Sequence, residues 1–406
     1  MRKNILADSQ ISCTGCGACV ASCHKKAITL SINEEGFYAP VVDGNLCVDC
    51  GACQKVCYRF IAFTNHTCEM RDKTVYGVYS SNQVIQHTTT SGGCAYELSL
   101  WGIDHGYKIM GVIYDYEKDQ AKTVLISQQK DLELLKGSKY IQSDTSEAFA
   151  LLLEEAKKDQ SQKYICIGTP CQIFGLRQLI RRHHLANELI LVDLFCHGVP
   201  SYNVWKPYIS QKRRELGKLN QVQFRHKGNG WHQYTIRLLG EKGIYSEFAY
   251  KDMFYRYFFD NVALNTSCFT CALRKEYVAS DLRLGDFLGG AYEQREDGVS
   301  AALVATDKGD WLLKELAKEK RIIIDREWLS TDCLKAQSTC DYLNLYLRDK
   351  VIMKLRDGED LGNVQHFYFR YLPFKNRLRS YFKRLVTFLP PSMLMIIRRF
   401  YRAFFS

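Results

Sequence analysis

Two stretches near the amino terminus repeat one pattern, CTGCGACVASC at 13–23 and CVDCGACQKVC at 47–57. Each reads C-x2-C-x2-C-x3-C, so each carries four cysteines at the same spacing. Gly15, Gly17 and Gly51 stand inside the runs, where glycine allows tight turns and a close backbone approach. The repeat therefore predicts two compact loops that each present a set of thiolates.

This spacing is the one that binds two [4Fe–4S] clusters in bacterial ferredoxins, where the fourth thiolate of each run reaches the other cube. It assigns Cys13, Cys16, Cys19 and Cys57 to one cluster, and Cys47, Cys50, Cys53 and Cys23 to the other. His24 and Tyr58 stand where proline is usual after the fourth cysteine. Two structural zinc sites built from C-x2-C pairs are the alternative, although a fourth thiol at x3 spacing fits a zinc ribbon poorly.

Length and composition limit the class of protein. The 406 residues correspond to two or three domains, and 46% hydrophobic with 24% charged residues exclude a disordered chain. The 17 cysteines are too many for incidental core thiols, and residues 1–13 contain no apolar segment typical of a secretion signal. We therefore expect a cytoplasmic protein whose reduced cysteines serve metal or redox chemistry.

Cysteine density, apolar runs and charge divide the chain into segments. They are a ferredoxin-type domain at 1–65, two parts of a body at 70–155 and 156–330, and a helical region at 331–406. Apolar runs at 108–114, 164–167 and 189–195 predict buried strands, with helical patterns between several of them. This alternation favours an α/β body with a mixed sheet, α+β overall, and no GxGxxG or GxxxxGK[ST] fingerprint occurs.

Four further cysteines are candidates for a third cluster. Thr169 is a candidate N-cap, which places Cys171 in the first turn of a helix, where the positive helix end favours thiolate. Cys196 follows the next predicted strand, so a right-handed crossover would bring it to the same sheet edge. The pair Cys268 and Cys271 would complete the four ligands. Buried core thiols at 171 and 196, with a small zinc clip at 268–271, are the alternative.

Three short motifs offer groups that can hold phosphate. TTTSGG at 88–93 precedes a predicted helix and supplies hydroxyls and backbone N–H groups at its positive end. KGSKY at 136–140 adds two ammonium groups around a turn, and DLRLGDF at 281–287 ends a strand with a carboxylate. Taken singly, each motif is more simply a turn or a solvated loop.

In their common order, these motifs resemble the beta-subunit family of coenzyme F420-reducing hydrogenases and dehydrogenases over about residues 70–330, with the ferredoxin-type domain in front. The matching stretches are SGG at 91–93, KGSKYIQSD at 136–144, GTPCQ at 168–172, CHGVPS at 196–201, CFTC at 268–271, LRLGDF at 282–287 and GVSAALVATDKG at 298–309. Leu288 departs from the aromatic residue often found after LGDF.

The resemblance implies a body that binds FAD and a [4Fe–4S] cluster and moves a hydride between FAD and the deazaflavin coenzyme. It implies FAD contacts from Ser91, Gly92, Gly93, Gly137, Ser138, Lys139, Tyr140, Thr169 and Asp286, and cluster ligation by Cys171, Cys196, Cys268 and Cys271. One relative in this family reduces a hydroxymethyl chlorophyll, so the fold leaves the substrate open. We assign no catalytic residue, because His197 in a turn after a strand is more simply structural.

Electron counting indicates the function. Cubane clusters pass single electrons and a hydride carries two, so a flavin is needed between them. We therefore expect an iron–sulfur flavoprotein oxidoreductase that links a redox partner protein or ferredoxin to a small hydride donor or acceptor, coenzyme F420 or another compound. The alternatives are an electron-transfer subunit that feeds a partner enzyme and a metal-stabilised binding protein without redox function.

The net charge of +11 is a property of the carboxyl-terminal tail. Residues 366–406 carry nine Lys or Arg and no Asp or Glu, and 375–389 shows a helical period with one apolar, aromatic face. This pattern is typical of peripheral contact with the inner, anionic face of a membrane; packing on the body or a partner is the alternative. We do not expect nucleic-acid binding, because the basic residues interleave with apolar ones, or a membrane span, because the apolar runs are short.

Overall fold

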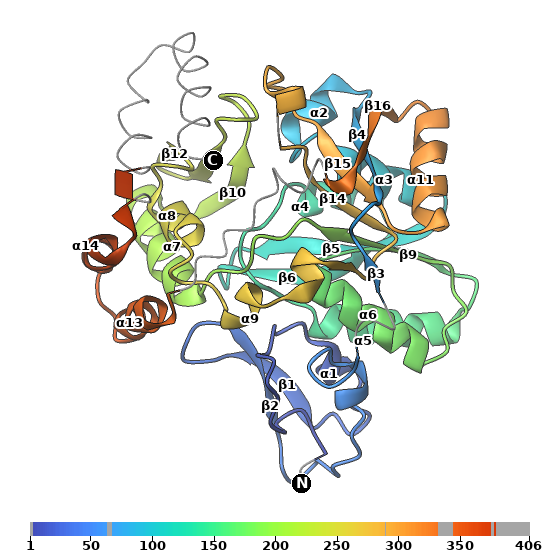
Figure 1. Ribbon diagram of the computed structural model, residues 1–406, viewed down its shortest axis with the longest axis horizontal. Helices are drawn as coiled ribbons and strands as arrows, with labels where there is room; N and C mark the ends of the chain where they lie inside the picture. Colours follow the sequence, from blue (N-terminus) through green and yellow to red (C-terminus); the bar gives the residue numbers. More distant parts are fainter. Residues whose placement is uncertain (1–2, 63–66, 289, 332–343, 375–376, 379–406) are drawn as a thin grey trace.

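The computed structural model describes residues 3–62, 67–288, 290–331, 344–374 and 377–378. Figure 1 shows a small head at the amino-terminal end, a large sheet flanked by helices, and a lobe beside the sheet. Most of the helix predicted at 375–389 lies outside the described residues. No helix within the described ranges has the length and apolar character needed to cross a membrane.

The head is built from the two cysteine runs and a hairpin that lies between them in the sequence. Its elements are α1 (Ala18–Ala21), β1 (Ile28–Ile32), β2 (Tyr38–Val42) and a 3-10 helix (Gln54–Val56). Gly15, Gly17 and Gly51 have φ of 65°, 77° and 72°, in the left-handed region that favours glycine. These residues let each run turn tightly enough to gather its thiols.

The body rests on a mixed sheet of nine strands in the order β16-β4-β15-β14-β9-β8-β5-β6-β7. In that order the strands are Ile322–Leu329, Thr74–Ser80, Ser300–Val304, Leu282–Asp286, Leu189–Leu194, Lys163–Ile167, Tyr107–Asp115, Gln120–Ile126 and Ser143–Asp144. β14, β9, β8 and β5 run parallel as neighbours and form the centre of the sheet. The strands predicted from the three apolar runs are β5, β8 and β9, and the mixed α/β class is confirmed.

Helices cover both faces of this sheet. They are α2 (Gln83–Thr88), α3 (Cys94–Asp104), α4 (Leu132–Leu135), α5 (Ser146–Lys158), α6 (Pro170–Arg182) and α11 (Asp307–Lys318). Alternate residues of β9 enter two separate cores: Ile190 and Val192 pack with α3 and α11, whereas Leu189 and Leu191 pack with α5 and α6. The carboxyl ends of β8, β9 and β14 therefore meet at one edge, where α/β proteins place ligands.

The lobe beside the sheet has an aromatic core. Its elements are α7 (Tyr202–Leu216), β10 (Leu219–His226), β11 (Thr235–Gly240), β12 (Gly243–Phe248), α8 (Met253–Phe259), α9 (Thr266–Phe269), α10 (Ala272–Lys275), α13 (Leu345–Arg356) and α14 (Leu361–Tyr371). The ring of Trp205 lies 4.8 Å from that of Phe224 and 4.9 Å from that of Phe254. The same core includes Phe37 of the head and Val351 of α13, so three parts of the chain share it.

The short strands β3 (Cys68–Glu69) and β13 (Tyr277–Val278) pair with each other and join the start of the body to the segment after α10.

Polar contacts fix the head on the body. Gln142 accepts from the backbone N–H of Tyr38 at 2.8 Å and donates to the carbonyl of Thr14 at 2.8 Å. Thr145, at the start of α5, donates to the carbonyl of Cys16 at 2.7 Å. Because Gln142 and Thr145 hold the backbone of the first cysteine run, this loop keeps a fixed position against the sheet.

Candidate functional site

Four thiols of the head line one small cavity. They are Cys13, Cys16 and Cys19 of the first run and Cys57 from the end of the second. Burial raises the pKa of the Cys57 thiol to about 12, and the neighbouring Cys13 adds to the effect. Four such thiols ionise together only beside strong positive charge, so iron binding here would release protons and stabilise the fold. Cys57, the fourth cysteine of the second run, therefore lies beside the first three cysteines of the first run, as the ferredoxin spacing predicts.

The second set of head thiols lies nearer to solvent. Burial raises the pKa of Cys53, and Cys23 of the first run adds to this rise, so each run supplies its fourth cysteine to the other set. Cys47 accepts from the side chain of Asn4 at 3.6 Å. Cys50 is exposed.

The spacing of these thiols bears on the zinc alternative. Around one zinc ion, thiolates at about 2.3 Å from the metal stand roughly 3.8 Å apart. Within the residues that the structure describes, no three His, Cys, Asp or Glu side chains converge closely enough to hold a single ion. Two runs of four cysteines at C-x2-C-x2-C-x3-C spacing are the donor set of two [4Fe–4S] clusters, so the donor set fits these clusters better than zinc.

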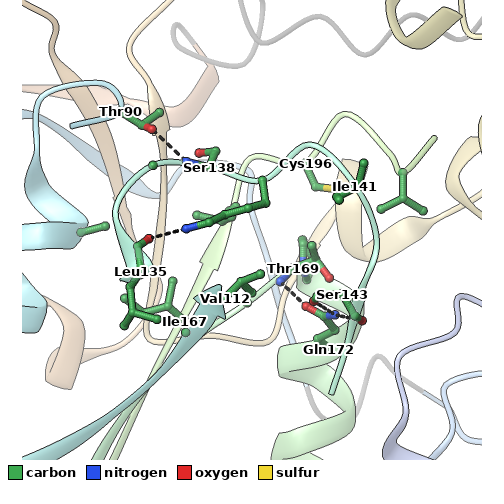
Figure 2. Close-up of a pocket in the computed structure, with 18 of the residues that line it drawn as sticks. Thr90, Val112, Leu135, Ser138, Ile141, Ser143, Ile167, Thr169, Gln172 and Cys196 are labelled. Carbon is green, nitrogen blue, oxygen red and sulfur yellow. Dashed lines mark hydrogen bonds between the residues drawn. The ribbon is translucent and has the colours of Figure 1, made fainter. Parts of the chain in front are cut away.

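The four candidate cysteines of the body converge on a second cavity, of about 210 Å³. It is lined by Cys171, Cys196, Cys268 and Cys271. Figure 2 shows this cavity with Cys196 labelled among its lining residues. Burial raises the pKa of Cys196 to about 11 and that of Cys271 to about 12, and Cys171 adds to both rises. The thiols therefore lie close enough to feel one another's charge, as the ligands of one cluster would.

Local sequence explains how these four thiols are positioned. Thr169 caps α6 in a capping box with Gln172, as the sequence predicts, and this sets Cys171 in the first turn. Cys196 comes two residues after β9 ends, at the neighbouring strand end. Cys268 lies in α9, and Cys271 is the N-cap of α10.

The body thiols and the inner head thiols are neighbours. A Cβ built on Gly175, one turn after Cys171, would stand 2.7 Å from Cβ of Ala18 and 3.4 Å from Sγ of Cys16. The ring of Tyr58 fills the space beside this contact, edge-on to Phe174 with centroids 6.4 Å apart. Burial raises the pKa of Tyr58, and Cys271, Cys171 and Cys16 contribute, which places this ring between the two sets.

Several residues of the expected FAD set line the same cavity as the body thiols. They are Gly93, Gly137, Ser138, Lys139 and Thr169. Figure 2 shows Ser138 joined to Thr90, whose hydroxyl accepts from the Ser138 backbone at 3.0 Å. The ammonium of Lys139 donates to the carbonyls of Leu134, Leu135 and Lys136 at 2.9–3.1 Å, and burial lowers its pKa to about 7. In the structure, Lys139 thus closes the carboxyl end of α4.

A larger cavity, of about 710 Å³, continues from the first one. It shares Ser138, Lys139 and Thr169 with the first and adds Ser91, Tyr140 and Asp286 from the expected FAD set, with Cys196 on the common wall. The carboxylate of Asp286 pairs with Arg225 and accepts from Trp231 at 2.8 Å. Asp286 therefore joins the sheet edge to the lobe.

Gly92 does not line either of the two cavities described above. Its amide donates to the hydroxyl of Ser300 at 2.9 Å, and a Cβ there would lie 2.5 Å from the carbonyl of Val78. Gly92 thus serves close packing of the loop against the sheet.

Sequence reasoning missed the cations and rings that the lobe adds to the larger cavity. Arg225, Trp231 and Tyr234 lie on or between β10 and β11, and Arg274 follows the last cysteine by three residues. Arg274 lowers the pKa of Cys271, although burial outweighs it. In the sequence, only the position of Arg274, three residues after the C-x2-C pair, could have pointed to the site. Arg225 and Tyr234 stand in stretches that look like ordinary strands.

Comparison with known proteins matches two parts of the chain to known families. Residues 161–327 match the family that describes the C terminus of the coenzyme F420 hydrogenase/dehydrogenase beta subunit, and residues 12–60 match the 4Fe-4S dicluster domain. The beta-subunit match includes all four body thiols, and the dicluster match includes all eight head cysteines. The chain thus joins an iron–sulfur dicluster domain to a part that matches an oxidoreductase family, and the resemblance expected from its motifs is confirmed.

Two individual proteins are similar to this chain. The coenzyme F420-dependent sulfite reductase of Methanocaldococcus jannaschii is 23% identical over 325 residues, which are 76% of this chain and 46% of that protein. The chain therefore spans about half the length of this curated relative. A chain in the solved F420-reducing [NiFe] hydrogenase complex from Methanosarcina barkeri aligns with a TM-score of 0.46 and 14% identity, over 71% of this chain and 91% of that one.

Proposed function

We propose that the chain is an iron–sulfur flavoprotein oxidoreductase that carries electrons between a redox partner protein, such as a ferredoxin, and a two-electron substrate. One observation carries this proposal. Three thiol sets follow one another from the exposed Cys50, through the buried inner head set, to the body set on the wall of the two joined cavities. This order suits electron transfer in single steps between solvent and a buried site.

The joined cavities are the proposed FAD site. FAD, when bound, supplies the exchange between single electrons and a hydride. For this chain's own residues, we propose that Ser91, Gly93 and the turn at Gly137–Ser138 lie against the phosphate groups, because all four residues line the cavities. Thr169 would orient the ring system near Cys196, which both cavities share.

The larger cavity favours an anionic substrate. Arg225, Arg274 and Lys275 line it against one carboxylate, that of Asp286, which pairs with Arg225. Aromatic rings from the lobe, such as that of Trp231, line it as well, and charges beside such apolar surface attract an anion more strongly than charges in water. Coenzyme F420 is one candidate, and other oxidised anions with a planar group satisfy the same chemistry.

Cofactor analysis of the full chain, purified without oxygen, tests the proposal. We expect about twelve irons and about twelve sulfides per chain, as three [4Fe–4S] clusters require, together with extractable FAD. The double variant Cys268→Ala/Cys271→Ala should fall to about eight irons, whereas the matched control Cys68→Ala, outside all three sets, should keep the full content. Zinc in place of iron, or iron without flavin, would contradict the proposal.

A second candidate is an electron-transfer subunit that feeds a partner enzyme and turns over no substrate itself. The observation in its favour is that residues 161–327 match the C terminus of a beta subunit, a type of chain that works with partner chains. The isolated, loaded chain can be given a reduced deazaflavin and an artificial acceptor. Turnover would support the first candidate; turnover only after a partner is added would support the second.

A further inference from the structure

Thr14 belongs to both thiol sites. It stands in the head, between Cys13 and Cys16, and lines the small cavity of the inner head thiols. It also lines the cavity of the body thiols, although it is far from them in sequence. No other residue is shared by these two cavities in the described part of the chain.

The Thr14 side chain reaches a body thiol. Burial raises the pKa of Cys171, and the hydroxyls of Thr14 and Thr169 both act against this rise, that of Thr169 from 3.3 Å. Thr169 caps the helix that carries Cys171, so its contact is local. Thr14 approaches the same sulfur from the other domain.

The approach of Thr14 is rigid. Gln142 holds its carbonyl at 2.8 Å with a side chain that also binds the backbone of Tyr38. Thr14 itself is 9% exposed, and the close contact of Gly175 with Ala18 brings the two domains together beside it. The backbone that carries this hydroxyl is therefore held in place against the body.

A hydroxyl in this place has an electrostatic consequence. A thiolate bound to iron can only accept a hydrogen bond, so the Thr14 hydroxyl would be the donor. Reduction adds negative charge to a cluster, and a donor at its sulfur stabilises the reduced form more than the oxidised one. Hydrogen bonds to ligand sulfurs are among the factors that set cluster potentials.

We propose that Thr14 is a positioning residue through which the head raises the reduction potential of the body cluster, by donating from its hydroxyl to Sγ of Cys171. This inference rests on the proposed function, since it requires a cluster on the four body thiols. It makes the docked head part of the electronic environment of the body site as well as its electron source. The reduction potential of the body cluster would then depend on the head being docked on the body.

Redox titration of the loaded full chain, followed by electron paramagnetic resonance, tests this proposal. The signal that is lost in Cys268→Ala/Cys271→Ala identifies the body cluster. Thr14→Val, which removes the hydroxyl at nearly constant volume, should lower the potential of that signal by about 59 mV, which is a roughly tenfold weaker equilibrium for one-electron reduction. Thr14→Ser, which keeps the hydroxyl, should stay near the parent value. Thr29→Val on the exposed face of β1 is the matched control and should shift nothing.

The outcomes separate this proposal from the one on which it rests. A parent chain with about eight irons and no third signal would overturn both. A full set of three signals, with the body potential unmoved in Thr14→Val, would overturn the role of Thr14 alone, and so would a shift confined to the head signals. If Thr14→Val does not load its clusters, Thr14→Ala provides the same loss of the hydroxyl with a smaller side chain, and the same shift is expected.

Discussion

Alanine at position 175 should strain the contact between head and body. The new Cβ would stand 2.7 Å from Cβ of Ala18, where carbon atoms prefer about 3.5–4.0 Å. Helices α1 and α6 would have to separate by roughly 1 Å at this point, and overpacking of this kind costs about 1–3 kcal/mol. Alanine also favours the helix over glycine by about 0.8–1.0 kcal/mol. We therefore expect Gly175→Ala to lower the free energy of unfolding by about 0–2 kcal/mol.

A double-mutant cycle separates the contact from helix propensity. Ala18→Gly removes the methyl group that the new Cβ meets, so the double variant Ala18→Gly/Gly175→Ala should be more stable than the two single effects predict. The expected coupling energy is about 1–3 kcal/mol, equal to the overpacking cost. It can be measured by urea unfolding of the loaded full chain without oxygen, using matched transitions of the four proteins. A coupling energy below about 0.5 kcal/mol would mean that the two sites act independently, and the close approach of α1 to α6 would be refuted.

Three further predictions concern buried polar groups. Asp193→Asn should lower the free energy of unfolding by about 3–5 kcal/mol. The reason is that Asp193 accepts two hydrogen bonds from Arg283, at 2.6 and 2.7 Å, and both side chains are fully buried. Thermal unfolding measures this loss, and a loss below about 1 kcal/mol would contradict the prediction. Burial lowers the pKa of Lys227 to about 8, while its ammonium donates to the carbonyls of Ser91 and Asp297 at 2.6 and 2.8 Å. Since an unfolded lysine has a pKa of about 10.4, the unfolded chain binds more protons between pH 8 and 10, and the free energy of unfolding should rise with pH across that window. The rise should be smaller in Lys227→Met, and equal slopes in the two proteins would argue against a depressed pKa. Gln142→Leu should cost about 1–3 kcal/mol, because it leaves the buried N–H of Tyr38 without its acceptor; an unchanged urea midpoint would show that this bond is replaced.

Sequence reasoning succeeded where the signal is local and dense. The spacing within each cysteine run brings three thiols together through glycine turns, so Cys13, Cys16 and Cys19 could be grouped without a structure. The cap at Thr169 follows from the residues of its own turn. Strands β5, β8 and β9 begin and end within one residue of their apolar runs, because buried strands of a parallel sheet are continuously apolar.

The residues that sequence reasoning could not find depend on tertiary structure. Arg225 reaches the cavity only because β10 and β11 pair in the lobe and the lobe packs against the end of β14. Conversely, the SGG motif gave no sign that Gly92 packs against Ser300 and Val78, since a motif of three residues does not specify which way its amide points. Thr14 and Cys171 belong to two different domains, so the local sequence around either residue does not predict that they lie close together.

The order of the three thiol sets follows from their positions in the fold, without any property of the clusters. Cys50 is exposed, Cys19 and Cys57 are buried within the head, and the body thiols line a cavity on the far side of the close contact between Ala18 and Gly175. A partner protein in solution can approach the first set closely, whereas it is kept from the third by the folded chain. If electrons enter from such a partner, they must cross the contact between α1 and α6. Any change that opens this contact should therefore slow reduction of the body cluster by the partner while leaving reduction of the outer head cluster unaffected.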